Sequence, residues 1–406
     1  MDTDGILSGI RVIDCGTYIA GPASATVMSD FGAEVFKIER PQGGDLFRLF
    51  PHLPGSPKSE LNYCWILTGR NKKSVALDLT DPEGREALLR LVKTADVFVT
   101  NYQSQLLEKF RLTWEDLNAI NPRLIFAHIT GYGEAGDDAD LPAFDALAYW
   151  ARSGLMTSVT GRDGTPSGPR PGIGDHPTAT ALFGAIMLGL YDRQRTGRGS
   201  KVSTSLIASG AWAHGCDLQA KMFGAEFAQL KGPHPINPLS SGYITRDSKL
   251  FLLVQLDPEH EFPRLCKMLG APELASDPMF STGESRTEHA AELSAILQSQ
   301  FESKDLAEWR KEFRKYDIKW SQLPMLGDVV DDPQMRAAGA FVELEYPGHG
   351  TIETINSPMF VSGAEKRKPT AAPEVGEHTR EVLRELGYTN DAIDAMVRRG
   401  IAASTP

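Results

Sequence analysis

One aspartate stands where a loop rich in glycine and proline meets a long apolar helix. Asp175 follows Gly168–Gly174 and precedes Pro177, and apolar residues then recur at spacings of three and four up to Tyr191. This spacing predicts a helix with one buried face. Because proline is tolerated in the first helical turn, Asp175 is placed at or next to the N-cap. The glycines would let a bulky ligand approach the backbone.

Two interpretations of Asp175 follow from this pattern. In the first, it only caps the helix and accepts a backbone N–H that would otherwise be unpaired. In the second, the positive end of the helix favours the ionised carboxylate, which acts as a nucleophile. Capping aspartates are far commoner than catalytic ones, so the local pattern by itself favours the first interpretation, although the two are compatible.

The elements around Asp175 alternate between strands and helices. Strands are predicted at residues 10–14, 34–39, 74–79, 96–100, 124–130 and 201–206, and helices at about 20–28, 82–94, 143–154, 177–196 and 208–227. This alternation is typical of a doubly wound parallel sheet, whose ligands bind at the carboxyl ends of the strands. Residues 228–240, which are rich in proline, form the clearest break in composition. Beyond them we predict a smaller α+β unit, then two antiparallel strands near 341–353 and two terminal helices.

Composition and charge exclude several classes of function. A formal net charge of −11 argues against nucleic-acid binding and against attraction to an anionic membrane. No run of about 18 apolar residues could span a membrane, and the acidic N-terminus does not resemble a signal peptide, so we expect a cytoplasmic protein. The four cysteines form neither a CxxC pair nor a disulfide framework, and we expect no metal site.

The turn after the first strand also limits the ligand. Its glycines at positions 16 and 21 do not form the G-x-G-x-x-G pattern of a dinucleotide site, and the chain has neither a G-K-[ST] P-loop nor the G-x-S-x-G of a serine hydrolase. Any anionic ligand therefore needs a local basic cluster. Arg40 and the group Arg70, Lys72 and Lys73 are candidates, with a solvated surface face as the alternative.

Several short stretches, taken in order, resemble the class III CoA-transferase family, which also contains CoA-ester racemases. They are Gly9–Asp14, Ala20–Pro22, Gly32–Arg40, Asn71–Ser74, Gly131–Gly133, Gly174–Asp175, Tyr191–Gly199, Lys201–Leu206 and Gly376–Thr379. The resemblance covers nearly the whole chain, and with it the nucleophile becomes the favoured interpretation of Asp175.

The resemblance implies a fold and an assembly. It implies an α/β protein with a split, Rossmann-like large domain over residues 1–225 and 330–406 and a small α+β domain over residues 226–329. It also implies a homodimer whose two subunits interlock as rings.

The resemblance further implies the chemistry. Asp175 would attack an acyl-CoA, and acyl-aspartyl anhydride and aspartyl-CoA intermediates would pass CoA to a free carboxylic acid. CoA esters are then substrates, and no cofactor is bound permanently.

The family's CoA pocket can be carried over position by position. The matching residues are Thr17, Ala20, Arg40, Leu77, Asn101, Tyr102 and Lys109. Ile19 departs from the polar residue that some members carry, and Lys72 and Lys73 are candidate phosphate neighbours. Gly174 and Asp145 are candidate supporting residues for Asp175.

The racemase branch offers an internal test. It places a histidine directly before an aspartate to move the proton beside the thioester, whereas this chain has Phe144 before Asp145. Phenylalanine cannot transfer a proton, so racemisation is the alternative rather than the main prediction. Asp145 is instead expected to orient the Asp175 anhydride or an acceptor, or to be a second acid at a helix start.

Among transferases, the stretches around Gly131, Asp145 and Asp175 look most like the branch acting on 2-hydroxy acids, arylacrylates or other enoates. The carnitine or dicarboxylate branch stays open. His176 and His128 are expected to be structural, and Glu377 and His378 have no role that the sequence defines. A protein that binds CoA esters without turnover is the remaining hypothesis.

Overall fold

The computed structural model describes residues 5–159, 167–227 and 237–405. It contains two compact units. The large unit comprises Met1–Thr160, Pro166–Glu226 and Gly339–Pro406, and the small unit comprises Phe227–Ala338. Each is described separately below.

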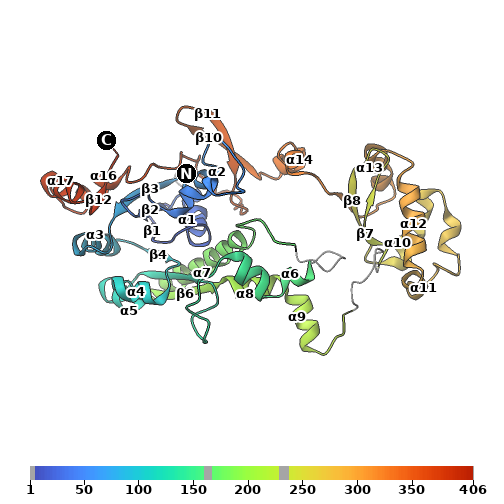
Figure 1. Cartoon of the computed structure of the whole chain (residues 1–406), viewed down its shortest axis with the longest axis horizontal. Helices are drawn as coiled ribbons and strands as arrows, with labels where there is room; N and C mark the ends of the chain where they lie inside the picture. Colours follow the sequence, from blue (N-terminus) through green and yellow to red (C-terminus); the bar gives the residue numbers. More distant parts are fainter. Residues whose placement is uncertain (1–4, 160–166, 228–236, 406) are drawn as a thin grey trace. The chain divides into compact units, whose positions relative to one another are not determined.

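The large unit is built on a seven-stranded sheet. Its strand order is β12-β3-β2-β1-β4-β5-β6 (Figure 1). The strands are β1 (Arg11–Asp14), β2 (Glu34–Glu39), β3 (Lys72–Leu77), β4 (Val97–Thr100), β5 (Ile125–Thr130), β6 (Ser200–Ser205) and β12 (Ala402–Ala403). All neighbouring strands pair in parallel except β12, which pairs antiparallel with β3. From β3 to β6 this is the order of Rossmann folds, which confirms the predicted α/β class.

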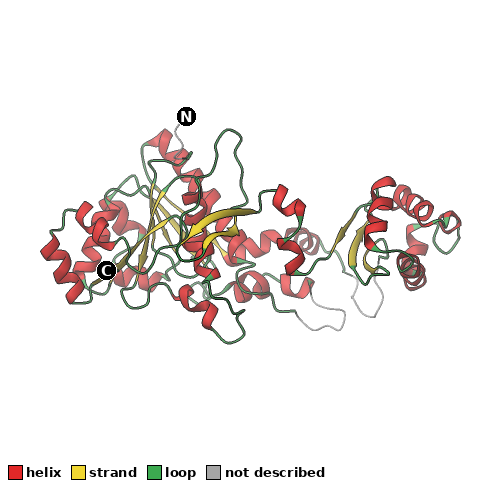
Figure 2. Ribbon diagram, turned by 90° about the horizontal axis from the view of Figure 1, so that it is seen from above, coloured by secondary structure: helices red, strands yellow, loops and turns green. Residues whose placement is uncertain are grey.

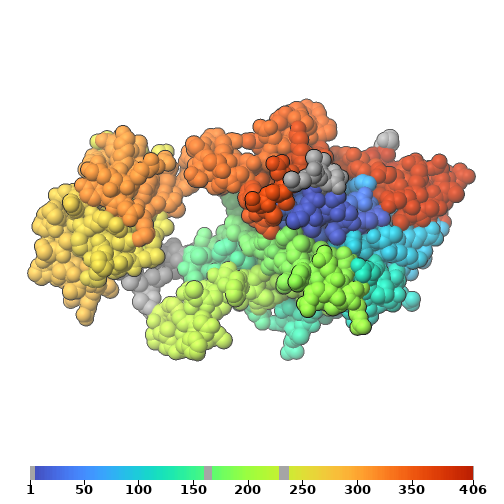
Figure 3. Space-filling view, turned by 180° about the vertical axis from the view of Figure 1, so that it is seen from behind, coloured from blue at the N-terminus to red at the C-terminus, as the bar shows by residue number. Residues whose placement is uncertain are grey.

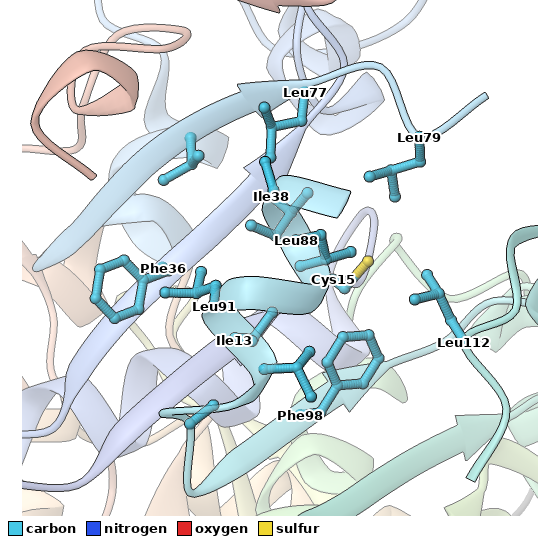
Figure 4. Packing of buried hydrophobic residues seen from close by; sticks show 14 of the residues in the cluster. Ile13, Cys15, Phe36, Ile38, Leu77, Leu79, Leu88, Leu91, Phe98 and Leu112 are labelled. Carbon is cyan, nitrogen blue, oxygen red and sulfur yellow. The ribbon is translucent and has the colours of Figure 1, made fainter. Parts of the chain in front are cut away.

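Side chains of successive strand residues enter two different cores. Val12, Val35 and Val97 pack under α1 (Ala20–Asp30) and α7 (Asp175–Thr196). Ile13, Phe36 and Phe98 point to the opposite face (Figure 4). That face is covered by α3 (Pro82–Val92), α4 (Ser104–Phe110), α5 (Trp114–Ile120), α16 (Thr379–Glu385) and α17 (Asn390–Arg398). Because strand residues alternate between faces, apolar residues at adjacent positions bury both sides of the sheet.

The large unit has further helices and a separate two-stranded sheet (Figure 2). They are η1 (Leu46–His52), α2 (Tyr63–Gly69), η2 (Ala146–Arg152), α6 (Leu155–Ser158), α8 (Leu206–Ala213), α9 (Gly215–Met222), β10 (Phe341–Tyr346) and β11 (Gly350–Ile355). Two predictions need correction. The helix expected over 143–154 is a π-helix, η2, and the one expected over 208–227 is divided into α8 and α9 at His214.

The motif Gly376–Thr379 joins the C-terminal segment to β3. The Gly376 N–H donates to the Ser74 hydroxyl, and the Thr379 hydroxyl accepts from the Ala76 N–H at 2.9 Å. A Cβ on Gly376 would lie 2.3 Å from the Ala403 carbonyl oxygen. The C-terminal residues, red in Figure 3, lie on the surface of this unit, and β12 among them pairs with β3. This motif therefore has a structural role at the edge of the sheet, which the sequence did not define.

The basic cluster predicted near β3 is not available to a ligand. Lys72 is buried and donates to Asp14 at 2.8 Å, and Arg70 is buried and donates to Asp30 at 2.7 Å. Lys73 forms ion pairs with Glu34 and Glu381. The interpretation of Lys72 and Lys73 as phosphate neighbours is therefore wrong, because acids distant in the sequence neutralise both.

Lys72 belongs to a buried charge network beneath the turn that follows β1. Lys37 donates to the Gly16 carbonyl at 2.5 Å and pairs with Asp45 at 2.7 Å, and Asp14 lies between Lys37 and Lys72. Burial alone would raise the pKa of Asp14, but Lys37 and Lys72 hold it below its usual value. Burial also lowers the pKa of Lys72 to about 8. Two cations and two anions thus compensate one another without solvent.

The Lys72→Met variant should therefore be strongly destabilised. Removing one partner of a buried ion pair costs about 3–5 kcal/mol, whereas Lys73→Met breaks partly exposed pairs worth about 1 kcal/mol or less. Thermal unfolding of both variants at pH 7 measures the difference. Equal losses for the two would show that the buried Asp14–Lys72 pair stabilises the fold no more than the partly exposed pairs of Lys73.

The small unit has a three-stranded antiparallel sheet (Figure 2). Its apolar core is separate from those of the large unit. The sheet contains β7 (Ser240–Ile244), β8 (Leu250–Val254) and β9 (Trp320–Gln322), in that order. Its helices are α10 (Pro258–Leu269), η3 (Pro272–Ala275), α11 (Gly283–Glu288), α12 (Ala290–Phe301), α13 (Leu306–Lys315), α14 (Leu326–Val330) and α15 (Pro333–Ala337). Trp309, Phe251 and Phe301 form the centre of the core.

Candidate active site

Two adjoining cavities open at the carboxyl ends of the parallel strands. The outer cavity, of about 410 Å³, is lined by residues in or after the carboxyl ends of β1 to β4, including Arg40, Leu77 and Phe110. The inner cavity, of about 230 Å³, reaches from the turn after β1 to Asp175. Both cavities are lined by Thr17, Asn101, Tyr102 and Gln103. They lie at the switch point of the sheet, between β1 and β4, where open α/β sheets bind ligands.

The outer cavity combines an apolar wall with a cation at its rim. Ile38, Leu77, Leu79, Leu106 and Phe110 supply the apolar wall. Arg40 is exposed, and no acidic side chain of the described residues forms an ion pair with it. These features suit a flat apolar group that carries an anion. Lys109 does not line this cavity: it is exposed on α4, with its ammonium 5.8 Å from the centre of the Phe110 ring.

The turn after β1 is held from both sides. The Asn101 side chain accepts from the Thr17 N–H at 2.8 Å and donates to the Thr17 carbonyl at 2.9 Å. Tyr18 has a φ of +61°, and its N–H donates to Asp45. A non-glycine residue in this conformation is strained and persists only where its surroundings fix it. The turn shared by the two cavities is therefore preorganised.

Asp175 does not cap its helix. It is the first residue of α7, Gly174 occupies the N-cap, and no side-chain cap bond forms. The carboxylate lies half-buried in the wall of the inner cavity, and among the described residues it has no hydrogen-bond or ion-pair partner. A carboxylate left without a partner in a cavity is costly for stability, so this geometry supports a chemical role.

Burial and the nearby Asp145 carboxylate raise the pKa of Asp175 to about 7. Burial and the Asp145 charge therefore outweigh the expected effect of the positive helix end, which would favour the ionised carboxylate. A carboxylate with a pKa near neutrality is more basic than usual and is still ionised in part at pH 7. Both properties suit a nucleophile.

Asp145 holds the loop that presents Asp175. One carboxylate oxygen accepts from the Gly172 N–H at 2.8 Å and from the Gly174 N–H at 3.1 Å. The other accepts from the Ala146 N–H at the start of η2. Asp145 is buried, so it acts on Asp175 through the backbone and through its charge rather than by direct contact with the cavity.

Gly174 is required by the closeness of Tyr149. A Cβ at Gly174 would lie 2.6 Å from the Tyr149 ring, closer than real contacts allow. We therefore expect Gly174→Ala to displace Asp175 and to slow any reaction at its carboxylate about tenfold or more, since misplacement of a reacting group by about 1 Å costs up to about 100-fold.

Gly184→Ala is the matched control, because a Cβ at this position in α7 meets nothing within 4 Å. Initial rates of the two variants, normalised to folded protein, make the comparison. Equal rates would show that the Gly174–Tyr149 contact does not position Asp175.

The other predicted residues fall at different places. Ala20 and Thr17 line the inner cavity, as do Phe144 and His128. His128 lies on β5 as expected, and its ring nitrogens contact the Glu134 carboxylate at 2.6 Å and the Tyr102 carbonyl at 2.9 Å. Neither nitrogen is therefore free for a substrate.

His176, Glu377 and His378 lie away from the inner cavity. His176 lines a separate apolar pocket with Pro177 and Ile355. The Glu377 carboxylate accepts from the Glu374 N–H, and the His378 N–H donates to the Ser74 carbonyl. These contacts support the structural interpretation of His176 and give the other two residues a part in the same edge of the sheet.

Sequence reasoning missed several residues that line the inner cavity. They are Tyr18, Gln103, Ser104, Leu141 and Leu206. The available signal was position, since Tyr18 and Gln103 follow the carboxyl ends of β1 and β4, where parallel sheets gather their ligand contacts. No sequence pattern indicates that the Tyr18 backbone adopts a positive φ.

The fold and the two cavities define an α/β protein with a partly buried carboxylate, Asp175, in the wall of a cavity at the carboxyl ends of its parallel strands. The model of CoA-transferase family III matches residues 7–379, and the chain belongs to this family. The resemblance described from the sequence is thereby confirmed, and CoA esters are the substrates that CoA-transferases use.

Characterised relatives align over almost the entire chain. One is (R)-2-hydroxy-4-methylpentanoate CoA-transferase from Clostridioides difficile, 32% identical over 96% of this chain and 97% of its own length. Another is cinnamoyl-CoA:phenyllactate CoA-transferase from Clostridium sporogenes, 33% identical over 96% of each chain. Succinyl-CoA:glutarate CoA-transferase from Mus musculus is 33% identical over 97% of this chain and 90% of its own length.

Solved structures share the fold. A CAIB/BAIF family protein from Brucella suis superposes with a TM-score of 0.81 at 27% identity, covering 94% of this chain and all of that one. Rv3272 from Mycobacterium tuberculosis gives a TM-score of 0.80, also at 27% identity, covering 93% of this chain and 99% of its own. Among the described residues, no helix is long and apolar enough to cross a membrane.

Proposed function

We propose that this protein transfers CoA from an acyl-CoA to a free carboxylic acid, with Asp175 as the covalent nucleophile. One observation carries the proposal. The Asp175 carboxylate lies without a partner among the described residues in the inner cavity, and burial and Asp145 raise its pKa to about 7. The family membership supplies the reaction class.

The reaction proceeds by four balanced steps. Asp175 attacks the thioester carbonyl of the donor, the C–S bond breaks, and CoA leaves as a thiolate from an acyl-aspartyl anhydride. The thiolate attacks the aspartyl carbonyl and releases the donor's carboxylate, which leaves aspartyl-CoA. The acceptor carboxylate attacks aspartyl-CoA to form a second anhydride and the thiolate. The thiolate then attacks the acyl carbonyl of that anhydride, which forms the new acyl-CoA and regenerates the Asp175 carboxylate. The energy of the thioester is retained throughout, so the sequence needs no ATP.

The outer cavity is proposed as the CoA site. The apolar wall that includes Leu77 would hold the adenine, and Arg40 would contact a phosphate. The pantetheine would then pass Thr17, Asn101 and Tyr102, which line both cavities, to reach Asp175.

For the acceptor, we favour 2-hydroxy acids, enoates and arylacrylates over carnitine or dicarboxylic acids. The relatives from Clostridioides difficile and Clostridium sporogenes act on acids of the first kind by name. Racemisation is disfavoured, because Phe144 stands where a proton-transferring histidine is needed. The homodimer of interlocked subunits is also part of this proposal and is supported by the family resemblance alone.

The test is the mass of the intact protein after brief incubation with a panel of acyl-CoAs. The native chain should gain a mass equal to CoA less water, as aspartyl-CoA, or to the acyl group, as the anhydride. The Asp175→Ala variant should gain neither. If the native chain binds CoA esters but forms no adduct with any donor, the covalent mechanism is wrong.

A further inference from the structure

We infer that the inner cavity selects acids with one carboxylate and an apolar, branched or aromatic chain, and that Phe144 is a main determinant of this choice. The inference rests on the proposed function, because it takes Asp175 as the point where the acyl group is attached. The lining of the inner cavity then determines which acyl groups can be attached to Asp175.

The charges in the cavity wall disfavour a second carboxylate. No lysine or arginine is among the described residues that line the inner cavity. Apart from the phenols of Tyr18 and Tyr102, its ionisable side chains are Asp140, Asp175 and His128, and both ring nitrogens of His128 are already hydrogen-bonded. A dicarboxylic acid would therefore lose water from its distal carboxylate without gaining a cation, and it would face other negative charges.

The apolar part of the wall suits a hydrocarbon chain. It is formed by Ile19, Ile129, Leu141, Ala143, Phe144 and Leu206. Phe144 is 55% exposed and Leu141 is 48% exposed, although both are large apolar residues. Both side chains line the inner cavity, where contact with an apolar chain would remove apolar surface of both partners from water.

An aromatic pair fixes one side of this wall. The rings of Tyr18 and Phe144 meet edge to face, with centroids 5.7 Å apart and an interplanar angle of 86°. This is a favourable arrangement for two aromatic rings. The strained Tyr18 backbone is held by Asp45, so Phe144 packs on a rigid neighbour. A third aromatic or branched group could pack on the pair.

The mechanism extends this choice to both substrates. Donor acyl group and acceptor acid are attached in turn to the same Asp175 carboxylate, so each must occupy the inner cavity. The donor and the acceptor should therefore belong to the same class of apolar monocarboxylic acids.

The experiment measures the initial rate of adduct formation with 4-methylpentanoyl-CoA, cinnamoyl-CoA, succinyl-CoA and glutaryl-CoA. On the native chain we expect the first two to react about 100-fold faster than the last two. Phe144→Ala should slow the first two about tenfold and leave glutaryl-CoA unchanged. Leu147→Ala is the matched control, because Leu147 is 50% exposed on the same stretch and does not line the cavity.

A variant with a gained cation completes the test. Leu141→Arg should raise the rate with glutaryl-CoA at least tenfold by supplying a partner for the distal carboxylate. If the native chain reacts with glutaryl-CoA as fast as with 4-methylpentanoyl-CoA, the inferred selectivity is wrong. If Phe144→Ala slows all four donors equally, Phe144 does not determine it. The absence of an adduct with any donor would instead overturn the proposed function.

Discussion

In the Asp175→Asn variant, the rate of CoA transfer is expected to fall about 1,000-fold or more, while the free energy of unfolding at alkaline pH is expected to rise. The amide cannot attack a thioester, and removing a covalent nucleophile typically costs at least this much. The substitution keeps the size of the side chain, so the cavity should stay intact. Steady-state transfer with the best donor of the panel measures the loss.

The raised pKa of Asp175 also predicts how transfer in the native protein depends on pH. Only the ionised carboxylate attacks the thioester, so the rate should fall as the pH is lowered through about 7. An acid limb near pH 4 instead would show that the carboxylate is ionised at lower pH than its burial and the Asp145 charge imply.

The same pKa shift predicts how the free energy of unfolding depends on pH. The dependence has the opposite sign to that of an aspartate whose pKa is lowered on folding. Because the pKa rises from 3.8 to about 7 on folding, the folded state favours the protonated carboxyl. That contribution is fully present below pH 3.8 and is lost as the pH rises through 7. Asp175→Asn removes the buried charge and should raise the free energy of unfolding by about 1–2 kcal/mol at pH 8, allowing for partial solvation, and by little at pH 4.

Asp192→Asn is the matched control for this effect. Asp192 lies on the same helix, α7, but is exposed, so its substitution should change the stability equally at pH 6 and pH 8. Chemical denaturation at pH 4, 6 and 8 gives the comparison. A gain for Asp175→Asn that is the same at pH 4 and pH 8 would contradict the buried-charge explanation.

The elements that carry the site were predictable because their signals are local. Apolar runs near Ile13, Phe36 and Phe98 indicate buried parallel strands, and ligand contacts in such sheets follow the strand ends. Thr17, Arg40 and Asn101 occupy such positions and line the cavities. Position along the chain was thus enough to place these residues near a ligand.

Features that depend on distant partners could not be predicted in the same way. Lys72 and Lys73 look like an anion site in sequence, but their acidic partners Asp14 and Glu381 lie 58 and 308 residues away along the chain. The family resemblance marked Asp145 as a candidate supporting residue, but its contacts could not be predicted. Its carboxylate accepts from the N–H groups of Gly172 and Gly174, which lie 27 and 29 residues later in the chain. A short local pattern carries no information on such pairings.

In the Asp145→Asn variant, the rate of CoA transfer at pH 8 is expected to fall about 100-fold. The acid limb of the pH–rate profile is expected to move to lower pH. Both carboxylate oxygens accept backbone N–H bonds, from Ala146 on one side and from Gly172 and Gly174 on the other. An amide can accept on only one side, so one group of donors loses its partner and the loop before Asp175 shifts. A misplaced nucleophile accounts for the slower rate.

The direction of the pH shift separates positioning from simple loss of folding. The negative charge of Asp145 contributes to the raised pKa of Asp175, so removing that charge should let Asp175 ionise at lower pH. A partly unfolded enzyme would give fewer active molecules with an unchanged profile. Asp137→Asn, at an exposed position in the loop before η2, should change neither the rate nor the profile. An unchanged acid limb in Asp145→Asn would mean that its charge does not act on Asp175, and the raised pKa would then be due to burial alone.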